Sequence, residues 1–171
     1  KKASEQNVPE SEFRLAMMYM SGQGVDRNDG ETARYLARAA EHGETSAQTI
    51  LGALHWGHNR PARKDILGSF ALSSMTIMTD DRQAFAWMQK ASLAGVAAAQ
   101  TAVAVMYHHG DGVVLDTPKA YAWYSIAAAK GDQDAAAMAN QLKEKMAPEL
   151  LTEGKKQLEE ISKTIRALPS R

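Results

Sequence analysis

A 33-residue pattern that occurs twice constrains this chain more than any other feature of its sequence. Residues 11–43 and 99–131 align without a gap at an offset of 88 residues. The aligned positions share a tyrosine, a Gly-x-Gly-Val element, a second aromatic residue, a pair of alanines and a final glycine. Repetition at this length is typical of proteins that stack one structural unit on the next. The sequence therefore predicts a repeat architecture.

A third and altered copy lies between these two. Residues 47–55 repeat the start of the first copy at an offset of 36, with His55 where that copy has tyrosine. Residues 80–95 repeat its end at an offset of 52. The difference of 16 residues is an insertion, which falls between His58 and Asp80.

Each copy predicts two helices joined by a turn. In the first copy Leu15 and Tyr19 recur at a spacing of four and share one helical face. The Gly-x-Gly-Val element then breaks the helix, and Asn28 or Asp116 follows as a candidate N-cap of the second helix. One such pair is too short to bury its own apolar face, so we expect neighbouring pairs to supply the core.

Two more helical segments follow the repeats, and the last is amphipathic. Its apolar stripe reads Leu150, Leu151, Leu158, Ile161, Ile165 and Leu168. We expect a capping helix of the kind that a solenoid end requires, with a partner-binding or dimerising helix as the alternative. We assign one domain over residues 1–171, with repeats at about 10–45, 46–97 (insertion 59–79) and 98–133, and C-terminal helices over 134–168.

The third copy, in GDGVVLDTPKAYAWYSIAAAKG, resembles the Sel-1-like repeat family, which is related to the tetratricopeptide repeat. The resemblance covers roughly residues 10–133; the departures are Ala16 and Ala104 for glycine, His55 for tyrosine, and the missing Gly-x-Gly-Val of the second copy. It implies an all-α, right-handed α/α superhelical solenoid that binds other proteins. Bacterial members of the family act as adaptors in envelope signalling, motility, polysaccharide regulation and host interaction, and some resemble immunity proteins that block a secreted toxin.

Composition argues against several classes of partner. Lys+Arg and Asp+Glu are both 20, so the formal net charge is zero, which disfavours nucleic acid and anionic membranes as partners. The chain has no cysteine, which removes disulfides and thiolate chemistry. It also has no run of 18 apolar residues, so we expect no membrane span.

Catalytic and metal-binding motifs are weak in this sequence. His55 and His58 are three apart and His108 and His109 are adjacent, but zinc usually needs three or four protein ligands. There is no HExxH, no phosphate loop and no nucleophile elbow. We therefore expect no metal, no cofactor and no enzymatic activity, with a hydrolase of cell-wall or similar polymers as a remote alternative.

Two groups of residues are candidate protein-binding surfaces. The first would line the concave side of the solenoid as an apolar row with a tryptophan at its middle, and comprises Phe13, Met17, Met20, Trp56, Val105 and His108. The alternative is that part of this row is buried between neighbouring units. The second group lies in the insertion and comprises Arg60, Arg63, Lys64 and Phe70.

These observations predict a non-catalytic adaptor that binds a partner protein through the solenoid surface. The alternative is an immunity-type inhibitor of one cognate secreted toxin or effector enzyme, which an individual insertion would suit. Family analogy points to a bacterial protein in the periplasm or otherwise exported, with the cytoplasm as the alternative.

Overall fold

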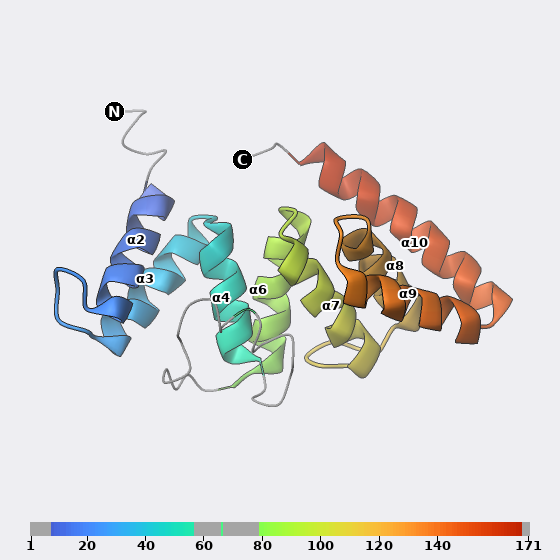
Figure 1. Ribbon diagram of the computed structural model, residues 1–171, viewed down its shortest axis with the longest axis horizontal. Coiled ribbons are helices and arrows are strands. Elements are labelled where there is room, and N and C mark those ends of the chain that lie inside the picture. Colours follow the sequence, from blue (N-terminus) through green and yellow to red (C-terminus); the bar gives the residue numbers. More distant parts are fainter. Residues whose placement is uncertain (1–7, 57–65, 67–78, 169–171) are drawn as a thin grey trace.

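The structure is a computed structural model that describes residues 8–56, 66 and 79–168. The described residues form eight α-helices and no strand, and these lie side by side in one elongated row (Figure 1). The helices are α2 (Val8–Ser21), α3 (Asp29–Glu41), α4 (Thr45–His55), α6 (Asp81–Leu93), α7 (Ala97–His109), α8 (Thr117–Ala128), α9 (Gln133–Lys145) and α10 (Pro148–Ala167). The predicted all-α solenoid is confirmed.

Three consecutive helix pairs build the solenoid. Helix α2 packs on α3, α4 on α6, and α7 on α8; these are called here the first, second and third pairs. Each pair also contacts the next, through α3 with α4 and through α6 with α7. The third pair continues the row by packing on α9. The apolar faces are therefore buried between neighbours, as the repeat pattern predicts.

One backbone hydrogen bond closes every pair at the same aligned position. The N–H of the N-cap residue of the second helix donates to a carbonyl in the last turns of the first helix, over 3.0, 2.8 and 3.0 Å. The three bonds are Asn28 to Tyr19, Asp80 to His55 and Asp116 to Tyr107. The insertion therefore leaves the geometry of the second pair in register, because both of its flanks keep their repeat positions.

A left-handed glycine ends the second helix of each pair. Gly43, Gly95 and Gly131 have φ values of +95°, +94° and +98°. Their N–H groups bond to carbonyls in the preceding turn, at 2.9 to 3.1 Å. Only glycine adopts such φ values without steric cost, so the final glycine of the repeat pattern fixes the turn into the next pair.

Small residues let the helices of the core approach one another closely. Gly52 in α4 is buried, and a Cβ added there would lie 2.8 Å from Cγ of Met88 in α6. The aligned aromatic residues Tyr35, Trp87 and Trp123 all contact the core, but only Trp123 is fully buried. All three aromatics therefore serve packing.

Helix α10 lies across α8 and runs back along the solenoid toward its middle (Figure 1). It packs on α8 instead of forming a hairpin with α9. Buried Gly154 makes this approach possible, since a Cβ at that position would lie 2.9 Å from Cδ1 of Tyr121. Four stripe residues pack against the core, namely Leu151, Leu158, Ile161 and Ile165, while Leu150 and Leu168 remain 47% and 45% exposed. Helix α10 is the predicted capping helix, laid over the side of the stack.

Candidate protein-binding surface

The tryptophan at the middle of the predicted row is in the core. Trp56 is 0% exposed, and its indole Nε1 donates to Oδ2 of Asp111 at 3.2 Å. Asp111 lies in the Gly-x-Gly-Val loop of the third pair and is itself buried. The prediction of an exposed tryptophan anchor is therefore wrong, because a loop 55 residues further along the chain covers the indole.

The other members of the row are half-buried. Phe13, Met17, Met20 and Val105 all pack against the core cluster. They leave no continuous apolar groove, since the central position of the row is filled by Trp56. The alternative interpretation, that part of the row is buried between neighbouring units, is the one that the structure supports.

His108, the last member of the row, sits in an aromatic cluster. Its ring stacks on His109 at 5.0 Å between centroids and meets Tyr124 edge-on at 6.2 Å. Burial lowers the pKa of His108, and the charges of His109 and Lys145 lower it further. Burial also raises the pKa of Tyr124 to about 12. Near neutral pH this cluster therefore favours a neutral imidazole and a neutral phenol.

The insertion contributes one described residue to the core. Ile66 is 7% exposed and belongs to the buried apolar cluster. The four predicted contact residues of the insertion, Arg60, Arg63, Lys64 and Phe70, lie outside the described residues. Their role in binding stays a prediction.

The loop of the third pair is wedged against the second pair. Gly112 has a φ of +67°, and a Cβ added there would lie 1.9 Å from the carbonyl oxygen of Asp81, the first residue of α6. The loop therefore contacts the second pair at two places, at Trp56 after the end of α4 and at Asp81 at the start of α6. The Gly-x-Gly-Val element thus joins pairs as well as turning the chain.

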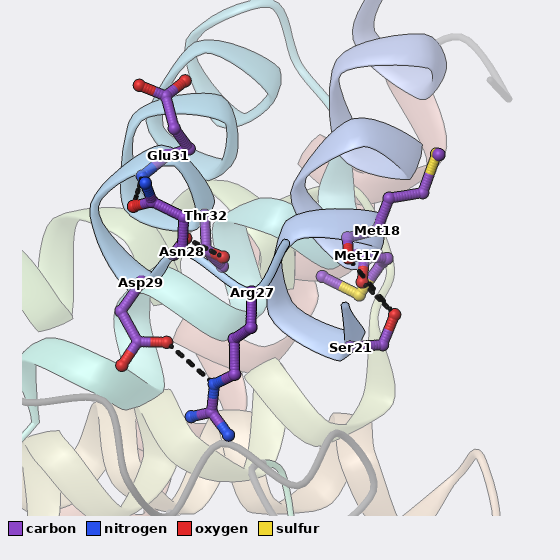
Figure 2. A network of polar contacts seen from close by, with 8 residues as sticks. All are labelled: Met17, Met18, Ser21, Arg27, Asn28, Asp29, Glu31 and Thr32. Atoms are coloured by element: carbon purple, nitrogen blue, oxygen red, sulfur yellow. Dashed lines mark hydrogen bonds and ion pairs between the residues drawn. The ribbon is translucent and has the colours of Figure 1, made fainter. Parts of the chain in front are cut away.

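Figure 2 shows local contacts in the same loop of the first pair. The side-chain oxygen of Asn28 accepts from the backbone N–H of Glu31 at 3.0 Å. The backbone carbonyl of Asn28 accepts from the hydroxyl of Thr32 at 2.9 Å. Arg27 forms an ion pair with Asp29 over 3.3 Å at the surface. The contacts drawn there all join residues within the first pair.

Buried glutamines tie each later pair to the one before it. Gln48 Nε2 donates to the carbonyl of Ala40, and Gln100 Nε2 donates to the carbonyl of Ser92, both at 3.0 Å. These carbonyls lie in the last turns of α3 and α6, and each also accepts from the N–H of the glycine that follows its helix, Gly43 or Gly95. The repeated glutamine therefore adds the same side-chain hydrogen bond at each boundary between pairs.

In the first pair Glu12 occupies the aligned position. One carboxylate oxygen lies 2.7 Å from Nη2 of Arg38 in α3, and the other lies 2.6 Å from Nδ1 of His42, the C-cap residue of that helix. The carboxylate is only 6% exposed. At this position the first pair therefore makes contacts within itself, whereas the later pairs bond to the pair before them.

Helix α10 forms one wall of an open groove. Two hollows of about 580 and 780 Å³ share Lys130 and Ile165, so they adjoin and form one surface, called here the α10 groove. The opposite wall is made by the glycine turns after α3 and α6 and by the end of α8. The groove therefore runs along the edge of the solenoid where one pair connects to the next.

Basic side chains predominate around the α10 groove. Five basic residues and two carboxylates line it among the described residues: Lys90, Lys130, Lys155, Lys163 and Arg166, with Glu44 and Glu159. Apolar lining comes from the stripe of α10 and from Leu93 at the end of α6. The sequence predicted a capping helix with a partner-binding helix as the alternative, but it did not predict the groove, because the turns that form its opposite wall are far from α10 in the chain.

The described residues contain neither a membrane-spanning helix nor a group of metal ligands. No helix in the described part of the chain is long and apolar enough to cross a membrane. Among residues 8–56, 66 and 79–168, no three side chains of His, Cys, Asp or Glu are grouped so as to hold a metal ion.

A family model matches three segments of the chain. The sequence model described as "Sel1 repeat" matches residues 9–44, 73–96 and 97–132, more than half of the chain. The chain belongs to the Sel1 repeat family. Sel1 repeats are generally protein–protein interaction modules; the first and third matched segments correspond to the first and third helix pairs, and the second contains α6 of the second pair.

Relatives of the chain occur in both yeast and bacteria. It is 30% identical over 134 residues to "Chitin synthase regulator SKT5" of Saccharomyces cerevisiae, covering 78% of this chain and 17% of that relative's length. A Sel1 repeat protein from Oxalobacter formigenes is 28% identical with a TM-score of 0.65, over 82% of this chain and 94% of the other. A protective antigen of uropathogenic Escherichia coli shares the fold, at 24% identity and a TM-score of 0.53, over 96% of this chain and 40% of its own.

Proposed function

We propose that this chain is a non-catalytic scaffold that binds a partner protein in the α10 groove. The observation that carries the proposal is the groove itself: an open surface with apolar and charged lining along the edge of the helix stack. Helices held by core packing are already ordered before binding, which lowers the entropic cost of association.

The buried carboxylates of the described residues favour binding over catalysis. These are Glu12 and Asp111, and neither lines the α10 groove. Glu12 is paired with Arg38 and His42, and Asp111 accepts from Trp56. Both serve packing between helices, so neither is placed to act as a general acid or base on a bound substrate.

Site-specific photo-crosslinking in the native cells tests the proposal. A benzophenone amino acid is introduced at Ser162, which lines the groove, and at Ala137, an exposed residue of α9, as the matched control. We expect a discrete crosslinked protein from the Ser162 variant and none from the Ala137 variant. Equal crosslinking from both positions, or none from either, would contradict a partner in this groove.

A narrower form of the proposal is an inhibitor that neutralises one cognate secreted enzyme. The insertion between His58 and Asp80 favours it, because a feature found in a single repeat suits a single partner. The test is whether the crosslinked partner is an enzyme and whether the purified chain abolishes its activity at a one-to-one ratio. Location in a bacterial periplasm also stays a prediction, which fractionation of the native cells checks.

A further inference from the structure

We propose that the α10 groove binds an acidic segment of the partner protein that also carries leucine-like side chains. This inference rests on the proposed function and assigns the chemistry of the partner. The protein as a whole has no net charge, so the excess of basic residues around the groove is a local feature. An acidic partner is attracted by that local field.

The two carboxylates in the groove are already engaged. Glu44 caps α4 by accepting from the backbone N–H of Ala47 at 2.6 Å. Glu159 forms an ion pair with Lys163 at 2.6 Å. Glu159 is therefore committed to Lys163, and the lining still holds five basic side chains against two carboxylates.

The basic side chains differ in what holds them. Lys90 stands over the ring of Trp87 at 4.3 Å, and Lys130 donates to the carbonyl of Gly95. Lys155 and Arg166 are exposed and form no ion pair with a carboxylate of the described residues. These last two mark the ends of the α10 wall and offer their charges to a partner.

The apolar lining sets the second requirement. Leu158 and Ile165 lie on the groove side of α10, and Leu168 beyond its end is 45% exposed. The wall from Lys155 to Leu168 spans 14 residues, which corresponds to about 20 Å of helix. A partner helix of similar length can place leucines against this strip and carboxylates toward the flanking cations.

The experiment uses a fluorescent 16-residue amphipathic peptide with leucines on one face and glutamates beside them. A matched peptide has glutamine at every glutamate position. Anisotropy titrations with the whole chain should show binding of the glutamate peptide, and affinity should fall several-fold between 50 and 300 mM NaCl because salt screens exposed charges. Equal affinity for the glutamine peptide would overturn the charge assignment.

Charge reversal locates the binding site. We expect Lys155→Glu combined with Arg166→Glu to raise the Kd for the glutamate peptide roughly tenfold or more. Lys156→Glu is the matched control, because Lys156 is the exposed neighbour on the same helix and is absent from the groove lining; its Kd should change less than about twofold. Circular dichroism and thermal melts verify that all variants fold. Equal loss in the control would overturn the site.

The outcome also separates this inference from the proposed function. If the partner crosslinked at Ser162 still binds the doubly reversed variant at wild-type affinity, the acidic-segment inference fails while the scaffold proposal stands. Binding of an anionic vesicle or an oligonucleotide more tightly than the glutamate peptide would likewise overturn it. If no crosslink forms at Ser162, the proposed function itself fails.

Discussion

The first and third pairs contain the same Gly-x-Gly-Val loop in two different environments. Gly24 and Gly112 have similar φ values, +76° and +67°. A Cβ added at Gly24 would meet one methionine methyl carbon at 3.5 Å, whereas one added at Gly112 would overlap the backbone of α6. The loop conformation is therefore a property of the repeated sequence, and its role in joining pairs depends on whether a neighbour lies against it.

The boundary residue shows the same contrast. Gln48 and Gln100 each donate to a carbonyl of the preceding pair. Glu12 instead contacts Arg38 and His42 within the first pair. A charged carboxylate is tolerated at this buried position only because two basic groups accompany it. Residues at one aligned position therefore make different contacts in the first pair and in the later pairs.

The comparison predicts its largest difference at Trp56 and Met20, which hold aligned positions. Trp56→Ala should lower the free energy of unfolding by about 4 kcal/mol, because it empties a fully buried site and removes the donor to Asp111. Met20→Ala, at a half-buried position, should cost about 1 kcal/mol. Urea unfolding followed by circular dichroism measures both. Similar losses would mean that the two pairs are packed alike.

The glycine loops give the next largest difference. Gly112→Ala should cost about 3 kcal/mol, since left-handed strain is added to an overlap with the carbonyl of Asp81. Gly24→Ala keeps the strain and meets no backbone, so it should cost about 1 kcal/mol. Thermal melts of the two variants check this order. A larger effect at Gly24 would show that the first loop is held by contacts beyond its own pair.

The smallest expected effect is a change in pH dependence at His108, which is aligned with Met20 and Trp56. Burial lowers the pKa of His108 in the folded chain, so the unfolded chain binds protons more readily there as pH falls below the usual histidine value. The contribution of His108 to stability is complete above the pKa of histidine in the unfolded chain. It is lost as the pH falls from that pKa toward the lower pKa of His108 in the folded chain. His108→Met, which installs the residue that the first pair has, should flatten the dependence of Tm on pH between 7 and 5. An unchanged slope would assign that dependence to other groups.

Much of the fold could be predicted from the sequence because its signals are local. The cap residues Asn28 and Asp116 and the final glycines act within a few residues of themselves, and the structure places them as predicted. Asp80 keeps its aligned bond to His55, while the bounds of the insertion stay a prediction. Repetition supplied the rest, because a pattern seen three times fixes the register of each copy.

The candidate site could not be predicted in the same way. An aligned position gives the direction of a side chain within its pair, but not what lies opposite it. Trp56 is buried by Asp111 from the next pair, and the α10 groove needs Ile165 to stand beside turns that precede it by more than 30 residues. These contacts depend on how pairs and the last helix are placed in space.

The sequence by itself determined the helix pairs, their boundaries, their left-handed turns and their order along the chain, because each of these follows from short-range hydrogen bonding and steric limits. Only the tertiary structure decided which apolar side chains remain accessible and where α10 lies. Burial is a property of a residue's neighbours in space, and those neighbours come from distant parts of the chain.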